Sequence, residues 1–118
     1  LIVANLPNAD MVGHSGCWEP TIEAIETIDK CLGEIIAAVD QCGANLIITA
    51  DHGNAEMLYC DTHEKAHTAH TTNPVPLLYY GDLDLKLKAS GDLTNIAATV
   101  LELMGLDGSP AMSDSLFV

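Results

Sequence analysis

Residues 46–54 have the sequence Leu-Ile-Ile-Thr-Ala-Asp-His-Gly-Asn, and this stretch does most to decide the fold. Its first four residues are aliphatic or β-branched and follow a Gly-Ala-Asn turn, which is typical of a short strand buried on both faces of a parallel sheet. In open α/β sheets ligands gather where such strands end, and Asp51 and His52 lie at that end. Their oxygen and nitrogen donors suit zinc or manganese, so the stretch predicts a strand that leads into a metal site.

An Asp-His pair on its own is weak evidence for a metal site, because Asp-His-Gly also occurs in ordinary turns, where the Asp caps the backbone. Further candidate ligands accompany this pair. Asp10 and His14 supply a second carboxylate and imidazole, although alone they would be read as a turn cap and a surface histidine. The remaining histidines are His63, His67 and His70. Carboxylates and imidazoles from separate segments are what a two-metal site requires.

Three longer motifs contain most of these candidate ligands. They are residues 8–16 (Asn-Ala-Asp-Met-Val-Gly-His-Ser-Gly), 49–56 (Thr-Ala-Asp-His-Gly-Asn-Ala-Glu) and 69–76 (Ala-His-Thr-Thr-Asn-Pro-Val-Pro). In content, order and spacing they resemble the cofactor-independent (2,3-bisphosphoglycerate-independent) phosphoglycerate mutases of the alkaline phosphatase superfamily. The resemblance continues through residues 93–101 and 112–116, so it covers nearly the whole chain.

The resemblance implies a fold and a domain organisation. We expect an α/β fold: a partial alkaline-phosphatase-like sheet, mainly parallel, with helices on both faces. Residues 1–118 would form the C-terminal part of the metal-binding phosphatase domain. The family's serine nucleophile, its phosphotransferase domain and the upstream strands would lie outside this chain, so no catalytic nucleophile is expected within it.

The resemblance also implies a ligand set. Asp10, His14 and His70 would hold one divalent ion. Asp51 and His52 would hold a second ion, together with an aspartate and the serine from outside this chain. Manganese is the metal that the family implies, while zinc and cobalt suit the same donors.

Several histidine assignments stay open on the sequence alone. Nothing in the residues themselves favours His70 over His67 as a ligand, and only the family motif selects His70. His63 and His67 are expected to be loop residues. A structural zinc site built from Cys60 and these three histidines is a further alternative.

The family reaction is an isomerisation in glycolysis and gluconeogenesis, in which a metal-activated serine takes the phosphate of 3-phosphoglycerate and returns it to the 2-hydroxyl. By resemblance we expect the full-length protein to catalyse it in the cytoplasm on this small-molecule substrate, as a monomer, and the chain alone to be inactive. An exposed sheet edge favours self-association of the chain alone. The alternatives are another superfamily enzyme, such as a phosphopentomutase or metal-dependent phosphatase, and a non-catalytic metal-binding module. The run at residues 69–76 argues against the other superfamily enzymes.

Composition limits the partners further. The chain has 17 Asp and Glu against 4 Lys and Arg, a net charge of -13, which repels nucleic acids and anionic membranes. No apolar run approaches the roughly 20 residues of a membrane span. The four cysteines form no Cys-x-x-Cys pair, which favours reduced thiols in a cytosol.

The spacing of apolar residues and the residues that begin or end helices predict the local elements. Apolar residues at helical spacing indicate one helix from Pro20 to just before Gly43, and another between an Asp92 N-cap and Gly105. Strands are expected at residues 1–3, 46–49 and 77–80, a loop at 10–14, and a functional loop at 59–73 that returns His70 to the site.

Overall fold

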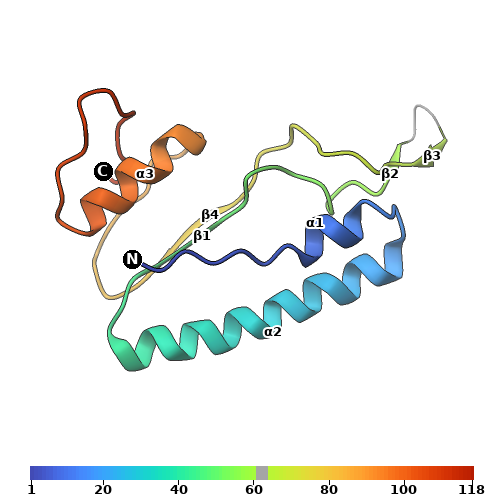
Figure 1. Cartoon of the computed structure of the whole chain (residues 1–118), viewed down its shortest axis with the longest axis horizontal. Helices are drawn as coiled ribbons and strands as arrows, with labels where there is room; N and C mark the ends of the chain where they lie inside the picture. The colour runs from blue at the N-terminus through green and yellow to red at the C-terminus, as the bar shows by residue number, and fades with distance from the viewer. Residues whose placement is uncertain (61–63) are drawn as a thin grey trace. The chain divides into compact units, whose positions relative to one another are not determined.

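The structure, a computed structural model, describes residues 1–60 and 64–118 (Figure 1). Its elements are α1 (Asn8–Gly13), α2 (Trp18–Cys42), β1 (Leu46–Thr49), β2 (Tyr59–Cys60), β3 (Lys65–Ala66), β4 (Leu77–Tyr80) and α3 (Leu93–Leu103). The chain forms two compact units, residues 1–82 and 83–118, and each is described by itself. The predicted mixture of helices and strands is confirmed.

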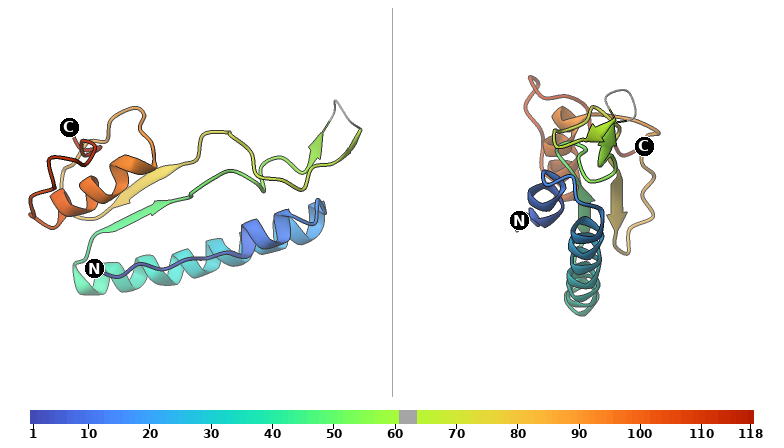
Figure 2. Two further views of the ribbon diagram at one scale, coloured as in Figure 1. Left: turned by 45° about the horizontal axis from the view of Figure 1, so that its top comes forward. Right: turned by 90° about the vertical axis from the view of Figure 1, so that its right-hand side faces the viewer.

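Helix α2 is the long helix that the apolar spacing predicts. It ends at Cys42 and is capped by Gly43, whose φ of 59° and ψ of 37° are left-handed values that glycine adopts without the steric cost of a β-carbon. The chain then reverses, and β1 runs back along α2 (Figure 2). Thr21 and Ala24 are buried, whereas Trp18 and Ile22 on the same helix are exposed.

Helix α1 occupies the place where the sequence predicts a loop, so that prediction is wrong. The amide of His14 donates to the carbonyl of Asp10 over 3.1 Å, a helical hydrogen bond between residues four apart. One turn of helix therefore brings both side chains to the same face. Helix α1 packs against α2.

Strands β1 and β4 pair antiparallel, with Leu46 opposite Tyr80 and Thr49 opposite Leu77. The expectation of a mainly parallel sheet is therefore not confirmed, since this pair is antiparallel. A parallel pair needs a crossover connection, usually a helix, and the segment between β1 and β4 contains a second hairpin instead. The expectation of helices on both faces stays a prediction, since α3 belongs to the other unit.

The pairs between residues 46 and 80 nest inside one another as in a single long hairpin. Inside the β1–β4 pair lies an isolated bridge between Gly53 and Thr71, and inside that bridge β2 pairs antiparallel with β3. We call residues 50–58 the outgoing arm and residues 67–76 the returning arm. The nested pairing brings His70, next to Thr71, opposite the residues that follow β1.

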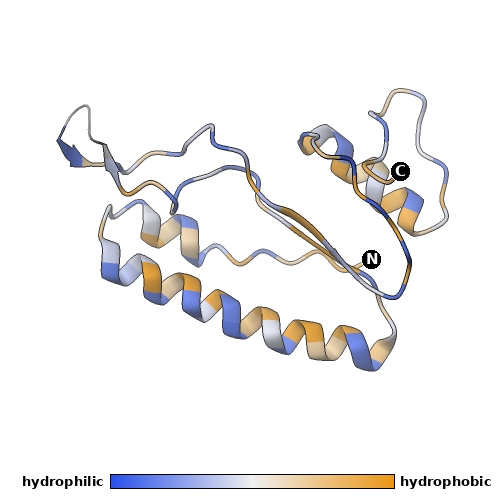
Figure 3. Ribbon diagram, turned by 180° about the vertical axis from the view of Figure 1, so that it is seen from behind, coloured by the Kyte–Doolittle hydropathy of each residue, from blue (hydrophilic) through white to orange (hydrophobic). Residues whose placement is uncertain are grey.

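Two predictions about strands are wrong in detail. Residues 1–3 form no strand: no described strand pairs with them, and they are 83–92% exposed. Strand β1 is half-buried rather than buried on both faces. Figure 3 colours β1 and β4 as largely apolar, so the pair presents apolar surface that the described residues only partly cover.

The second unit is built on α3. As predicted, Asp92 caps the helix: its carboxylate accepts from the amide of Thr94 over 2.8 Å, and the side chain of Asn95 accepts from the amide of Asp92. Thr99 is fully buried, and its hydroxyl accepts from the amide of Leu116 over 2.9 Å. These bonds fasten the C-terminal segment to the helix.

No helix in the described part of the chain is both long enough and apolar enough to span a bilayer. Cys17, Cys31 and Cys42 are free and exposed. The side chain of Cys60 and all of His63 lie outside what the structure describes, so the alternative zinc site that includes them stays untested.

Candidate metal centre

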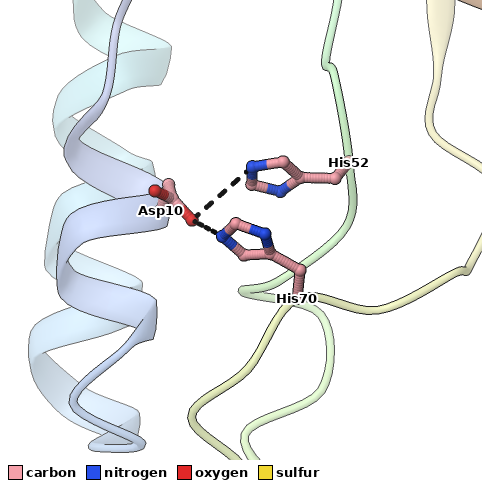
Figure 4. Close-up of side chains that lie close together, drawn as sticks. All are labelled: Asp10, His52 and His70. Atoms are coloured by element: carbon pink, nitrogen blue, oxygen red, sulfur yellow. Dashed lines mark ion pairs between the residues drawn. The ribbon is translucent and has the colours of Figure 1, made fainter.

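Three segments of the first unit bring their side chains to one place. Asp10 projects from α1, His52 from the outgoing arm directly after β1, and His70 from the returning arm (Figure 4). Both imidazole rings point toward the Asp10 carboxylate. A carboxylate oxygen and ring nitrogens of these three residues all lie within 4.8 Å of one another.

His14 joins this cluster from the C-terminal end of α1. Its Nε2 atom lies 3.2 Å from Oδ1 of Asp10 and 3.1 Å from Nε2 of His70. Nε2 of His70 in turn lies 3.1 Å from the same Asp10 oxygen. The three donor atoms form a triangle with edges of 3.1–3.2 Å.

The dimensions of this triangle and the tautomer of His14 fit a single divalent ion. Protein ligands of such an ion stand about 2.0–2.2 Å from it, so adjacent donor atoms are separated by roughly 3.0–3.5 Å. Nδ1 of His14 lies 2.8 Å from the carbonyl oxygen of Thr68. A carbonyl can only accept, so in the neutral ring the proton is on Nδ1 and the lone pair on Nε2 faces the cluster, as in metal-binding histidines.

Asp51 and His52 form a second, more open group. Nε2 of His52 lies 3.6 Å from Oδ1 of Asp51 and 4.0 Å from Oδ1 of Asp10, so the same ring nitrogen is near both carboxylates. The Asp51 side chain is 80% exposed, against 37% for Asp10. The ring of His52 stacks on that of His70 with centroids 3.5 Å apart. All five residues predicted from the sequence thus lie in one neighbourhood.

Asn54 orients the shared carboxylate. Its Nδ2 atom donates to Oδ1 of Asp10 over 2.7 Å, and the residue is only 4% exposed. This hydrogen bond is the main reason that the pKa of Asp10 lies below its usual value, and the nearby rings of His14, His70 and His52 lower it further. An ionised Asp10 attracts a cation at neutral pH.

Glu56 connects the two arms beside the cluster. Its carboxylate accepts from the amide of Asn54 over 2.7 Å, from Nδ2 of Asn73 over 2.9 Å, and from the hydroxyl of Thr71. The Thr71 hydrogen bond, followed by bonds from the amide of Glu56 itself, from Asn73 and from Asn54, lowers the pKa of Glu56 to about 2. We call Glu56, Asn54, Thr71 and Asn73 the arm clamp.

No role was predicted from the sequence for the residues of the arm clamp. The signal was present, because Asn54 and Glu56 follow the Asp-His pair within the same motif, and Thr71 and Asn73 follow His70. Polar residues at fixed offsets from candidate ligands are natural partners for orienting them. His67 instead contributes its amide, which donates to the carbonyl of Leu58 over 2.9 Å beside the β2–β3 hairpin.

Comparison with known proteins identifies a family for the chain. The sequence profile of the metalloenzyme superfamily matches residues 1–108. The chain belongs to the metalloenzyme superfamily. This superfamily member is 46% identical over 113 residues to the 2,3-bisphosphoglycerate-independent phosphoglycerate mutase of Pseudomonas fluorescens, and 50% identical over 106 residues to that of Escherichia coli O139:H28. The resemblance stated from the motifs is confirmed.

The matched region is a small share of these relatives. The match to the Pseudomonas fluorescens protein covers 96% of this chain but 22% of that protein. The match to the Escherichia coli protein covers 90% of this chain but 21% of that protein. A crystal structure of Leishmania mexicana phosphoglycerate mutase at low cobalt concentration matches with a TM-score of 0.86 and 33% identity, over 97% of this chain and 24% of that one. The chain therefore spans about a fifth to a quarter of the length of the proteins it matches.

Proposed function

We propose that this chain supplies metal ligands to a 2,3-bisphosphoglycerate-independent phosphoglycerate mutase, as the C-terminal part of its phosphatase domain. The enzyme would interconvert 3-phosphoglycerate and 2-phosphoglycerate through a phosphoserine, with the serine provided by sequence outside this chain. The observation that carries the proposal is the 3.1–3.2 Å triangle of Asp10, His14 and His70 donor atoms. The similarity to phosphoglycerate mutases over most of the chain supports it.

We infer that the five predicted ligands divide between two divalent ions. Asp10, His14 and His70 would hold the first. Asp51 and His52 would hold the second with ligands from elsewhere, which accords with the exposure of Asp51. Such ions stabilise the negative charge that builds on the oxygens of a phosphoryl group during transfer.

The residues of this chain would bind the metal ion and orient its ligands. Asn54 fixes the direction of the Asp10 carboxylate, and the Thr68 carbonyl fixes the tautomer of His14. Oxygen and imidazole donors suit manganese, and they also suit zinc or cobalt. We propose manganese as the working metal, in a cytoplasmic enzyme of glycolysis that acts on phosphoglycerate.

A chimeric enzyme tests this function directly. The aligned segment of the Pseudomonas fluorescens relative, 46% identical over 113 residues, is replaced by this chain. We expect the chimera to convert 3-phosphoglycerate without added 2,3-bisphosphoglycerate, and Asp10→Ala and His70→Ala to lower kcat at least 100-fold. Glu34→Gln, which removes one negative charge from an exposed position on α2, should leave the rate unchanged. A folded chimera that binds manganese but shows no mutase activity would overturn the assignment.

The isolated chain provides the complementary measurement. Without the serine and the remaining ligands it should show negligible conversion of 3-phosphoglycerate, even with saturating manganese. Robust turnover by the 118 residues alone would contradict the proposed division of labour.

A further inference from the structure

Glu56 lies where the two arms meet, although it is no part of the ligand triangle. It follows the Asp-His pair on the outgoing arm. Two of the three other residues that bond to its carboxylate, Thr71 and Asn73, lie on the returning arm within three residues after His70. Its third partner is the amide of Asn54, the residue that holds Asp10. Glu56 thus bonds to both arms directly, and it is linked to Asp10 on α1 through Asn54.

The backbone reinforces this connection at the same point. The amide of Thr71 donates to the carbonyl of Gly53 over 2.8 Å, as part of the bridge between the two arms. A β-carbon on Gly53 would collide with the hydroxyl of Thr71 and with Oε1 of Glu56. Because Gly53 has no side chain, the carboxylate of Glu56 has room to contact the returning arm.

The hydrogen bonds of Glu56 favour a supporting role over direct metal binding. Oε1 accepts from Thr71 and Asn73, and Oε2 accepts from the amide of Asn54, so both oxygens are engaged. The nearby carboxylate that faces the imidazole nitrogens is that of Asp10. The acceptors of Glu56 are used to hold backbone and side chains in place.

We propose that Glu56 is a positioning residue, which sets the distance of His70 from Asp10 and His52 by clamping the returning arm to the outgoing arm. This inference rests on the metal site proposed above, and it adds a determinant outside the ligands. Partners that orient metal ligands typically change metal affinity about 10- to 100-fold when they are removed.

The primary test is NMR on the metal-free chain in the presence of a chelator. The rings of His52 and His70 stack at 3.5 Å between centroids, and those of His14 and His70 lie at 4.9 Å. Both pairs should give nuclear Overhauser contacts between ring protons. We expect Glu56→Ala to remove both contacts, while the backbone contacts of Ile47 with Tyr79 in the β1–β4 pair persist.

Two further variants and a control sharpen the test. Glu56→Gln keeps an acceptor for Thr71 and Asn73 but turns a donor toward the amide of Asn54, so it should weaken the ring contacts only in part. Thr71→Val removes one donor and should act in the same direction as Glu56→Ala. Glu34→Gln matches the loss of one negative charge on an exposed helix position and should change nothing.

A titration with manganese by calorimetry gives the second readout, with an expected loss of about 10- to 100-fold in affinity for Glu56→Ala. Ring contacts that survive in both Glu56→Ala and Thr71→Val would overturn the proposal. Loss of the ring contacts together with the β1–β4 contacts would also overturn it, because the variant would then have unfolded more widely. If the ring contacts disappear as expected but the parent chain binds no manganese, the positioning role stands and the proposed metal function fails.

Discussion

Nδ2 of Asn54 donates to Oδ1 of Asp10 over 2.7 Å, and this bond joins a buried amide on the outgoing arm to a carboxylate 44 residues earlier on α1. The same nitrogen lies 3.3 Å from the backbone carbonyl of Asp10. Because Asn54 is shielded from water, the carboxylate is oriented by the fold itself rather than by a ligand. Binding of a cation there would need little rearrangement.

Removal of the Asn54 amide should loosen this carboxylate. We expect Asn54→Ala to lower the free energy of unfolding by about 1 kcal/mol, since the hydrogen bond to Asp10 is lost. The pKa of Asp10 should rise, because the Asn54 hydrogen bond is the main cause of its depression. Urea denaturation and a carbon-13 NMR titration of Asp10 measure the two effects. Asn5→Ala, at an exposed position, is the control and should alter neither.

The arm clamp should depend on pH in a defined direction. The pKa of Glu56 is lowered from 4.5 to about 2, chiefly by the Thr71 hydroxyl. A carboxyl with a lowered pKa contributes stability that is present above its unfolded value and is lost as the pH falls through the folded value. The clamp should therefore persist at pH 5 and weaken between 4.5 and about 2. A carbon-13 titration of Glu56 with a midpoint at its ordinary value would contradict this.

Two glycine substitutions should have opposite effects. Gly53→Ala places a β-carbon against Thr71 and Glu56 and should cost about 1–3 kcal/mol of stability, as overpacked sites do. Gly33 lies within α2 with nothing within 4 Å of its added β-carbon, so Gly33→Ala should stabilise the chain by roughly 0.5–1 kcal/mol. Parallel denaturation curves measure both. Equal destabilisation by the two variants would show that the crowding at Gly53 is unimportant.

The cap of α3 provides a test in the second unit. Asp92→Ala removes the acceptor for the amide and hydroxyl of Thr94 and should destabilise this unit. Asp107→Ala, at an exposed position, loses the same charge without a cap and should be nearly neutral. Hydrogen exchange of the α3 amides separates this local effect from changes in the first unit.

The helix ends and the candidate ligands could be predicted from the sequence because their signals are local. Gly43 ends α2 and Asp92 begins α3 through backbone chemistry that involves only nearby residues. The Asp-His-Gly motif marked the end of β1 correctly. Periodicity alone also sufficed to find α2.

The topology could not be predicted in the same way, because it depends on which segments pair. Leu46–Thr49 has the composition of a parallel strand, yet the hairpin between β1 and β4 turns the chain back and makes the pair antiparallel. The apolar residues 1–3 have strand propensity but no described partner strand. Asp10 lies in a one-turn helix too short for periodicity to reveal.

The arm clamp escaped prediction for a related reason. Glu56 meets Thr71 and Asn73 only because the nested hairpin brings the two arms together. Their role is a property of the pairing and not of any one motif. Likewise, the motif alone selected His70 over His67, and the structure places His70 in contact distance of Asp10.

Calorimetric titration of the chain with manganese tests the central claim most directly, with Asp10→Ala, His70→Ala and Glu34→Gln as variants. We predict saturable binding by the parent and by Glu34→Gln, weaker than in a full-length enzyme, and loss of binding in Asp10→Ala and His70→Ala. Indistinguishable isotherms for all four proteins would mean that manganese binds only to the general negative charge of the chain, and would contradict the proposed metal centre.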